Sequence, residues 1–303
     1  MTKILTAIAA ALTLGATTLT AGVTFDGSPG TGAPPATLGG YTMTSFDDDT
    51  RGIPGTVSDV TGPTGDVGFS PDLTHVEVGS GWATWSQGYT GDVYYSTGTT
   101  ITMTLPANTV AFQFYSEPNS FSTFTMEAIT DDGTSSGEIE VTGHGGAQYF
   151  GFYADGGDKI ASVTITVPSE ALGLAVGDFA IAACSAPEIS VSVSPSQLLT
   201  PNHQMADITA TVDVSGGCGD VTVALVSVTS DEADNGPDDG NTVNDIDGVT
   251  AGTEDYNFRV RAERCGSCDG RVYTVRYSAT DGDGNVSYGT ATISVPVGRG
   301  GLD

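Results

Sequence analysis

Carboxylates are the side chains of this sequence with the most obvious chemistry, because 37 Asp and Glu stand against nine Lys and Arg. Aspartates recur in turns rich in Gly and Asn, as in the run from Asp281 to Asn285. Oxygen ligands spaced through such turns suit Ca²⁺, which takes about six to eight of them. The candidate calcium ligands, drawn from both halves of the chain, are Asp281, Asp283, Asn285, Asp231, Asp234, Asp238, Asp26 and Asp178.

Other interpretations of the acidic residues stay open. Asp-Gly-Asp-Gly-Asn is ordinary turn chemistry, and an excess of carboxylates is typical of adaptation to salty water. In the first half of the chain, Asp26 and Asp178 can approach each other if the terminal strands of a domain pair. The densest cluster is Asp47, Asp48 and Asp49. The sequence therefore predicts bound Ca²⁺, with solvated acidic loops as the alternative.

Five aromatic residues lie close together in a stretch rich in Gly, Ser and Thr. Exposed aromatic faces beside polar groups can hold sugar rings, whereas buried aromatics are ordinary core filling. Trp82 and Trp85 are three positions apart, so they cannot both face inward on a regular strand. Core filling is the favoured interpretation, and the alternative is carbohydrate binding by Trp82, Trp85, Tyr89, Tyr94 and Tyr95.

Little in the sequence indicates catalysis. The three histidines, His75, His144 and His203, fall in different segments, and the sequence holds no nucleophile elbow, zinc-protease motif or phosphate loop. A pair of carboxylates for glycoside hydrolysis needs geometry rather than a motif, so a hydrolase remains an alternative. The prediction is a protein that is not an enzyme. A formal net charge of −28 excludes nucleic acid as a partner, because such a chain cannot neutralise phosphates.

Short alternating runs indicate the elements that must position these residues. Polar and apolar residues alternate in 100–105 and 162–167, and similar runs recur at 110–115, 124–130, 139–142, 150–153 and 175–181, separated by turns such as Asp131-Asp132-Gly133. Many short strands with regular turns predict an all-β sandwich or barrel. We expect such a domain over residues 22–183, followed by a linker at 184–187.

A second series of strands follows the linker, over residues 188–298, with a C-terminal tail at 299–303. Runs at 189–193, 207–214, 221–228, 256–262, 271–279 and 287–295, with a short strand near 244–247, give seven strands, the number in an immunoglobulin-like sandwich. Segments in this order resemble the immunoglobulin-like domain found at the C-terminal ends of bacterial extracellular and surface proteins. They are Leu199-Thr200-Pro201-Asn202-His203-Gln204, Val228-Thr229-Ser230-Asp231-Glu232, Arg261-Ala262-Glu263-Arg264, Gly270-Arg271-Val272-Tyr273 and Asp281-Gly282-Asp283-Gly284-Asn285.

The N-terminal half resembles, less specifically, the jelly-roll domains of exported bacterial proteins. Val23-Thr24-Phe25-Asp26, Phe150-Gly151-Phe152-Tyr153 and Val176-Gly177-Asp178-Phe179-Ala180-Ile181 carry this likeness. The expected fold class is therefore a jelly-roll β-sandwich followed by an immunoglobulin-like β-sandwich. Such domains act as spacers and adhesion modules in otherwise unrelated proteins, so the fold alone does not give the function.

All four cysteines lie in the last 120 residues. Because antiparallel strands reverse direction, the linker, the turn after the second strand and the turn before the last strand meet at one end of the second domain. This predicts a disulfide from Cys184 to Cys218, which leaves Cys265 with Cys268. A C-x-x-C pair can also be a redox motif or half a zinc site, but a thioredoxin-like site needs a βαβ context. The arginines at the opposite end are expected to bind the carboxylates of the acidic loop.

The N-terminus has the order of a secretory signal peptide. Lys3 precedes an apolar run from Ile4 to Leu14, and small and hydroxylated residues follow as far as Ala21. We expect cleavage after Ala21, giving a signal peptide of residues 1–21 and a mature chain without a membrane span. The sequence thus predicts a secreted structural or adhesive protein of the bacterial cell surface or extracellular matrix. Its expected partners are glycans or surface and matrix proteins, including itself, and a carbohydrate-binding protein or a glycoside hydrolase is the alternative.

Overall fold

Strands make up nearly all of the regular structure. The computed structural model describes residues 22–236 and 239–297, so the expected signal peptide, the calcium candidate Asp238 and the C-terminal tail lie outside the described residues. The one helical element that it describes is a short 3-10 turn, Ser169–Ala171 (η1). Within the described residues, no helix is long and apolar enough to cross a membrane. The chain is therefore all-β, as its alternating pattern predicts.

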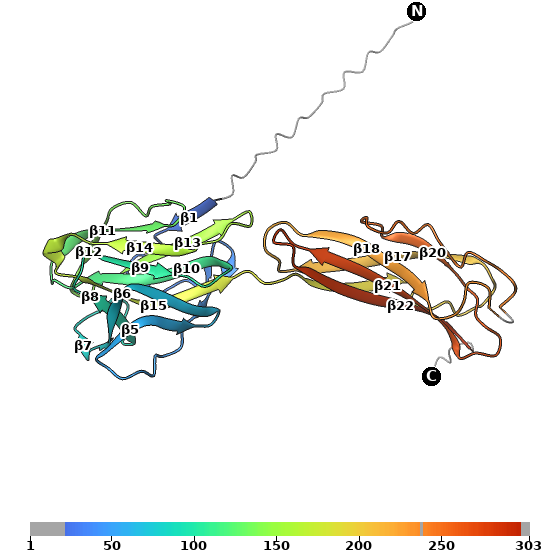
Figure 1. Ribbon diagram of the computed structural model, residues 1–303, viewed down its shortest axis with the longest axis horizontal. Coiled ribbons are helices and arrows are strands. Elements are labelled where there is room, and N and C mark those ends of the chain that lie inside the picture. Colours follow the sequence, from blue (N-terminus) through green and yellow to red (C-terminus); the bar gives the residue numbers. More distant parts are fainter. Residues whose placement is uncertain (1–21, 237–238, 298–303) are drawn as a thin grey trace, which may run out of the picture.

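The first sandwich, drawn from blue to yellow in Figure 1, contains the strands up to residue 183. They are β1 (Gly22–Asp26), β2 (Thr37–Leu38), β3 (Tyr41–Thr42), β4 (Thr44–Ser45), β5 (Gly55–Gly62), β6 (Gly65–Val78), β7 (Gly81–Trp82), β8 (Asp92–Ser96), β9 (Thr100–Thr104), β10 (Thr109–Pro118), β11 (Thr123–Thr130), β12 (Ile139–Thr142), β13 (Gln148–Asp155), β14 (Ser162–Thr166) and β15 (Leu174–Ala183).

The long strand β6 joins the two layers of this sandwich. Its C-terminal part pairs with β8 and its N-terminal part with β9. From β8 the sheet continues through β15, β10 and β13 to β1, and from β9 it continues through β14 and β11 to β12. Apolar side chains of both layers meet between them, among them Phe112, Phe150, Met103 and Ile165, all fully buried. Burial of this apolar surface is the main force that holds the curled sheet closed.

The strand order corrects one expectation. Asp26 on β1 and Asp178 on β15 do not approach each other through paired terminal strands, because β13 and β10 lie between β1 and β15. Three strand spacings of about 4.8 Å separate the two strands. These two carboxylates therefore do not form one cation site. The finer assignment of this sandwich to a jelly roll stays a prediction.

The second sandwich pairs a four-stranded sheet with a three-stranded sheet. Its strands are β16 (Glu188–Ser194), β17 (Met205–Ser215), β18 (Thr222–Ser230), β19 (Ile246–Asp247), β20 (Asn257–Arg261), β21 (Gly270–Thr280) and β22 (Val286–Pro296). The sheet orders are β16-β17-β20-β19 and β18-β21-β22. This is the order A-B-E-D facing C-F-G of a constant-type immunoglobulin sandwich. The fully buried side chains Tyr273, Val275, Tyr277 and Ile293 fill its core with those of the facing sheet.

The two sandwiches lie end to end (Figure 1), and the turns expected to meet at one end of the second sandwich do so. The N–H of Cys218, in the turn after β17, donates to Asp281 Oδ2, in the turn before β22, at 3.0 Å. The linker residue Ser185 accepts the N–H of Gly217 at 3.0 Å. The far end of this sandwich, where β21 begins, therefore lies a whole strand length away from the first sandwich.

Candidate functional site

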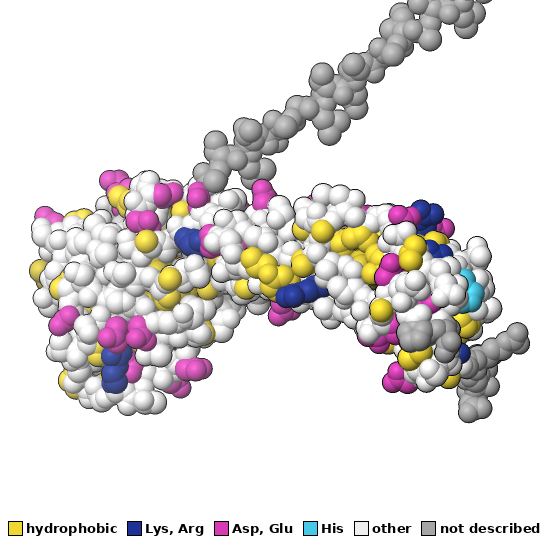
Figure 2. All heavy atoms as spheres, turned by 45° about the vertical axis from the view of Figure 1, so that its right-hand side comes forward, with side chains coloured by type: hydrophobic (Ala, Val, Ile, Leu, Met, Phe, Trp, Pro, Cys, Tyr) yellow, Lys and Arg dark blue, Asp and Glu magenta, His cyan; other side chains and the backbone are white. Residues whose placement is uncertain are grey.

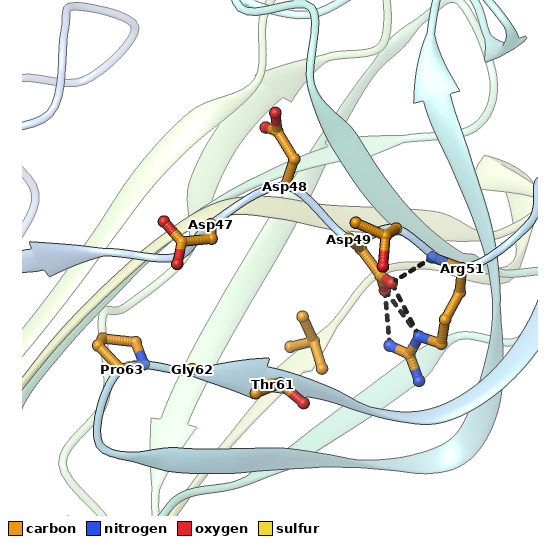
Figure 3. Close-up of a pocket in the computed structure, with 9 residues that line it drawn as sticks. Asp47, Asp48, Asp49, Arg51, Thr61, Gly62 and Pro63 are labelled. Carbon is orange, nitrogen blue, oxygen red and sulfur yellow. Dashed lines mark hydrogen bonds and ion pairs between the residues drawn. The ribbon is translucent and has the colours of Figure 1, made fainter.

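The acidic segment between β4 and β5 borders a surface cavity of about 290 Å³ (Figure 3). Asp47, Asp48 and Asp49 all line it, but their carboxylates point in different directions, as alternating side chains of an extended segment must. The three neighbouring aspartates therefore cannot hold one cation together. Figure 2 shows how acidic side chains are scattered over both sandwiches, with few basic ones among them.

Asp49 is anchored within the protein. Its carboxylate accepts hydrogen bonds from Arg51 Nε at 2.9 Å and Nη2 at 2.6 Å and from the Tyr94 hydroxyl at 3.0 Å. The hydrogen bonds from Arg51 lower the pKa of Asp49 to about 2. Only 7% of the Asp49 side chain is exposed. Its charge is therefore matched by Arg51, and it holds the segment onto the sheet rather than offering ligands.

A buried histidine lies behind this segment. His75 on β6 is fully buried, stacks on Tyr94 with ring centroids 5.1 Å apart, and shares a hydrogen bond of 2.7 Å between Nε2 and Asp92 Oδ1. Its Nδ1 lies 3.8 Å from Asp49 Oδ2. Asp92 also accepts the backbone N–H of Asp49 at 2.7 Å. Sequence reasoning missed this pair, because residues on β6 and β8 become neighbours only through strand pairing.

A second, smaller cavity of about 80 Å³ adjoins the first and gathers more carboxylates. Asp47, Asp48, Asp92 and Asp178 line it together with the Tyr89 ring, and none of its described lining residues is basic. Asp47 and Asp48 lie on its exposed side. The structure thus brings Asp178 towards Asp48 and Asp92, whereas the sequence paired it with Asp26.

Asp178 leaves the regular ladder where β15 bulges against β10. Its φ of 52° is in the left-handed region, which is uncommon for a residue other than glycine. Burial raises the pKa of Asp178 to about 6, although a hydrogen bond from Gln87 Nε2 at 2.5 Å opposes this effect. Ionising a carboxyl group beside other carboxylates costs free energy, and a bound cation would offset that cost.

The pH dependence of the first sandwich follows from these two aspartates. The pKa of Asp178 is raised, so its contribution to stability is present below about pH 4 and is lost as the pH rises through about 6. The pKa of Asp49 is lowered, so its contribution is present above about pH 4 and is lost as the pH falls towards 2. Carboxyl NMR titration of the calcium-free protein should give midpoints near 6 and near 2. In the variant Asp178→Asn, the loss of stability between about pH 4 and 6 should disappear. Titration midpoints near the usual value for both aspartates would contradict this assignment.

The other expected calcium ligands are used by the protein itself. Asp281 accepts the N–H groups of Cys218, Asp283 and Asn285, and Asp283 pairs with Lys159 of the first sandwich at 2.5 Å. At the far end of the second sandwich, Asp231 accepts the N–H of Val272, and Asp234 accepts those of Asn244 and Asp245. Asp26 accepts the N–H of Ser28. Asp281 and Asp26 therefore shape their own turns, whereas Asp231, Asp234 and Asp283 hold together segments that are distant in the sequence.

Arg261 and Arg271 bind the acidic loop, as the sequence indicates, whereas Arg264 donates to the backbone carbonyls of Cys265, Pro296 and Val297. Arg271 is fully buried and donates to Glu232 Oε2 at 3.1 Å and to Asp245, and Arg261 Nε donates to the same Asp245 at 3.0 Å. Asp239 and Glu263 are also buried beside Arg271, with ion pairs of 3.8 and 3.9 Å. Burial raises the pKa of Glu263. This network fastens the loop of residues 231–247 to β21.

The expected carbohydrate-binding aromatics do not form an exposed platform. Trp82 and Trp85 are each 7% exposed and Tyr94 is 2% exposed, whereas Tyr89 and Tyr95 are half-buried. Both tryptophans are buried because Trp85 lies in the loop after β7, so the alternation of a strand does not apply to it. Tyr94 belongs to the main core between the layers, and the other four lie in a second apolar cluster on the outer face of the sheet.

Both disulfides join the cysteines that the sequence analysis pairs, Cys184 with Cys218 and Cys265 with Cys268. The first disulfide lies at the joint between the sandwiches, where the Cα atoms of Gly157 and Gly219 also approach closely. The chain matches no protein-family model and no curated protein. Its likeness to bacterial extracellular domains rests on the residues quoted above.

Proposed function

We propose that the protein is a secreted, non-enzymatic structural or adhesive protein of the bacterial cell surface or extracellular matrix, acting as a stiff two-domain spacer. The observation that supports this proposal is the set of contacts at the joint between the two sandwiches. A disulfide, the Lys159–Asp283 ion pair and a close contact of Gly157 with Gly219 all connect the same two ends. A spacer needs a fixed angle between its domains, whereas a flexible tether needs none of these contacts.

Opening the joint disulfide should loosen this spacer. In the doubly substituted variant Cys184→Ser and Cys218→Ser, the distribution of distances between spin labels on the two sandwiches should broaden, as measured by pulsed electron resonance. The matched control, Cys265→Ser with Cys268→Ser, removes the other disulfide and should leave the distribution narrow. A wild-type protein with a distribution as broad as that of the joint variant would contradict the proposal.

We further propose that Ca²⁺ stabilises the first sandwich by binding in the smaller acidic cavity. The observation that favours this site is the position of Asp92 and Asp178 in a cavity whose described lining has no basic residue, with Asp48 on its exposed side. Ca²⁺ would replace the proton on Asp178, so its affinity should increase as the pH rises through about 6. Extracellular calcium modules bind with dissociation constants of about 10⁻⁴ to 10⁻³ M, so millimolar Ca²⁺ should be sufficient.

The melting temperature tests this site. A ligand at 100 times its dissociation constant adds about 2.7 kcal/mol, a rise of several degrees for a domain of this size. The melting temperature in Ca²⁺ should exceed, by this amount, the melting temperatures in Mg²⁺, in NaCl of matched ionic strength and in EDTA. Asp48→Asn should remove most of the rise, whereas Asp72→Asn, an exposed change of equal charge on β6, should not. Equal shifts in all salts would identify simple charge screening.

A further inference from the structure

The two disulfides differ in how their sulfur atoms are placed. In the joint disulfide, Cys184–Cys218, Cys218 is 2% exposed and Cys184 is half-buried. In the tip disulfide, Cys265–Cys268, Cys265 is 4% exposed but Cys268 is exposed. The tip disulfide lies in the turn before β21, at the end of the second sandwich away from the first. It thus joins one exposed cysteine to one buried cysteine.

We propose that the tip disulfide is a site of reversible modification by low-molecular-weight thiols, with Cys268 as the residue that carries the adduct. The thiolate of the small molecule attacks Cys268 Sγ, the Cys265–Cys268 bond breaks, and Cys265 leaves as a thiolate that takes a proton from water. One S–S bond forms as another breaks, so the step needs no external oxidant or reductant. Attack by the Cys265 thiolate on the adduct reverses it.

The surroundings of Cys265 favour its role as the leaving group. Its backbone N–H donates to Glu232 Oε2 at 2.7 Å, so this residue stays in place when the bond breaks. The Arg264 guanidinium is held on the Cys265 carbonyl at 3.0 Å, and the Ser267 hydroxyl lies 3.6 Å from the Cys265 sulfur. A hydroxyl donor beside a sulfur stabilises its thiolate. Thiol exchange at the tip therefore has an exposed target residue and a leaving sulfur with a hydroxyl beside it.

In the joint disulfide, both cysteines are held in place. The Cys184 N–H donates to Asn108 O at 2.9 Å and the Cys218 N–H to Asp281 Oδ2 at 3.0 Å, so both partners stay in position to re-form the bond. A carboxylate oxygen of Asp283 lies within 4.8 Å of both sulfurs. Because Asp283 is paired with Lys159, an ion pair lies beside this disulfide and restricts the approach of a thiol. The chain thus combines one protected disulfide with one that can exchange.

The rates at which the two disulfides open test this inference. The intact protein is treated with 2-mercaptoethanol at pH 8, quenched with acid at intervals and mapped by peptide mass spectrometry. The tip disulfide should open at least about tenfold faster than the joint disulfide, with the adduct on Cys268 and the free thiol on Cys265. Adduct mainly on Cys265, or a joint disulfide that opens as fast as the tip, would overturn the proposal.

A variant at the joint provides the matched control. Asp283→Asn removes the Lys159–Asp283 ion pair beside the joint disulfide and lies a strand length away from the tip. It should speed the opening of the joint disulfide and leave the rate at the tip unchanged. An increase at both disulfides would mean that general loosening controls their reactivity, and this would also overturn the proposal.

Discussion

Replacing Arg271 by methionine is expected to destabilise the second sandwich by about 3–5 kcal/mol, because it leaves buried carboxylates without their central cation. Arg271 donates to Glu232 and Asp245 and is fully buried, with Asp239 and Glu263 buried beside it. Methionine fills much of the same space, so the loss is mainly electrostatic. The loss should be smaller at pH 5 than at pH 7, since protonation relieves the repulsion among the carboxylates.

Arg259→Met is the matched control for this prediction. Arg259 also pairs with an aspartate, Asp247, but the two side chains are 51% and 48% exposed. An exposed pair of this kind contributes about 0–1 kcal/mol. Urea unfolding followed by circular dichroism measures both variants, while tryptophan fluorescence follows the first sandwich, which holds both tryptophans, Trp82 and Trp85. Equal losses in the two variants would show that Arg271 is not the centre of the network.

Much of the fold follows from local patterns in the sequence. Alternation at 100–105 and 162–167 predicts β9 and β14, and the seven runs after the linker match β16 to β22. Each antiparallel strand reverses the direction of the chain, so counting the strands also places Cys184 beside Cys218 without any knowledge of side-chain contacts. These features depend on residues that are close in sequence or on the reversal of direction from strand to strand.

The strands β5, β6 and β8 are not predicted from the sequence. In β5 and β6, Gly, Pro or Asp interrupts the apolar pattern. In β6, Gly68 and Ser70-Pro71 are typical of a turn, although both lie within a strand of 14 residues. Without β6 and β8, the proximity of His75 and Asp92 cannot be inferred. The wrong pairing of Asp178 with Asp26 has the same origin, since it depends on the order of strands in the sheet rather than on any local pattern.

Glu117 on β10 explains why the tryptophan segment is buried. The Glu117 side chain is 1% exposed and accepts hydrogen bonds from Trp82 Nε1 at 2.8 Å and from the Gly146 N–H at 3.1 Å. Trp82 belongs to the segment around β7, and Gly146 lies in the turn before β13. One carboxylate thus fastens two segments to the outer face of the sheet. Burial raises the pKa of Glu117, although these donors oppose the effect.

Replacing Glu117 by alanine is therefore expected to cost the first sandwich about 3 kcal/mol, because two buried N–H groups lose their acceptor and a space remains where the side chain was. Tryptophan emission should shift to the red as the segment around Trp82 and Trp85 becomes hydrated. Glu117→Gln keeps one acceptor oxygen and should lose less than half as much. Glu127 lies on the other layer, and its carboxylate accepts the hydroxyl of Ser135 among the described residues. Glu127→Ala should cost less than about 1 kcal/mol and leave the emission unchanged. If Glu117→Ala keeps both its stability and its blue emission, apolar packing alone holds the tryptophans, and the carboxylate is not what fastens them.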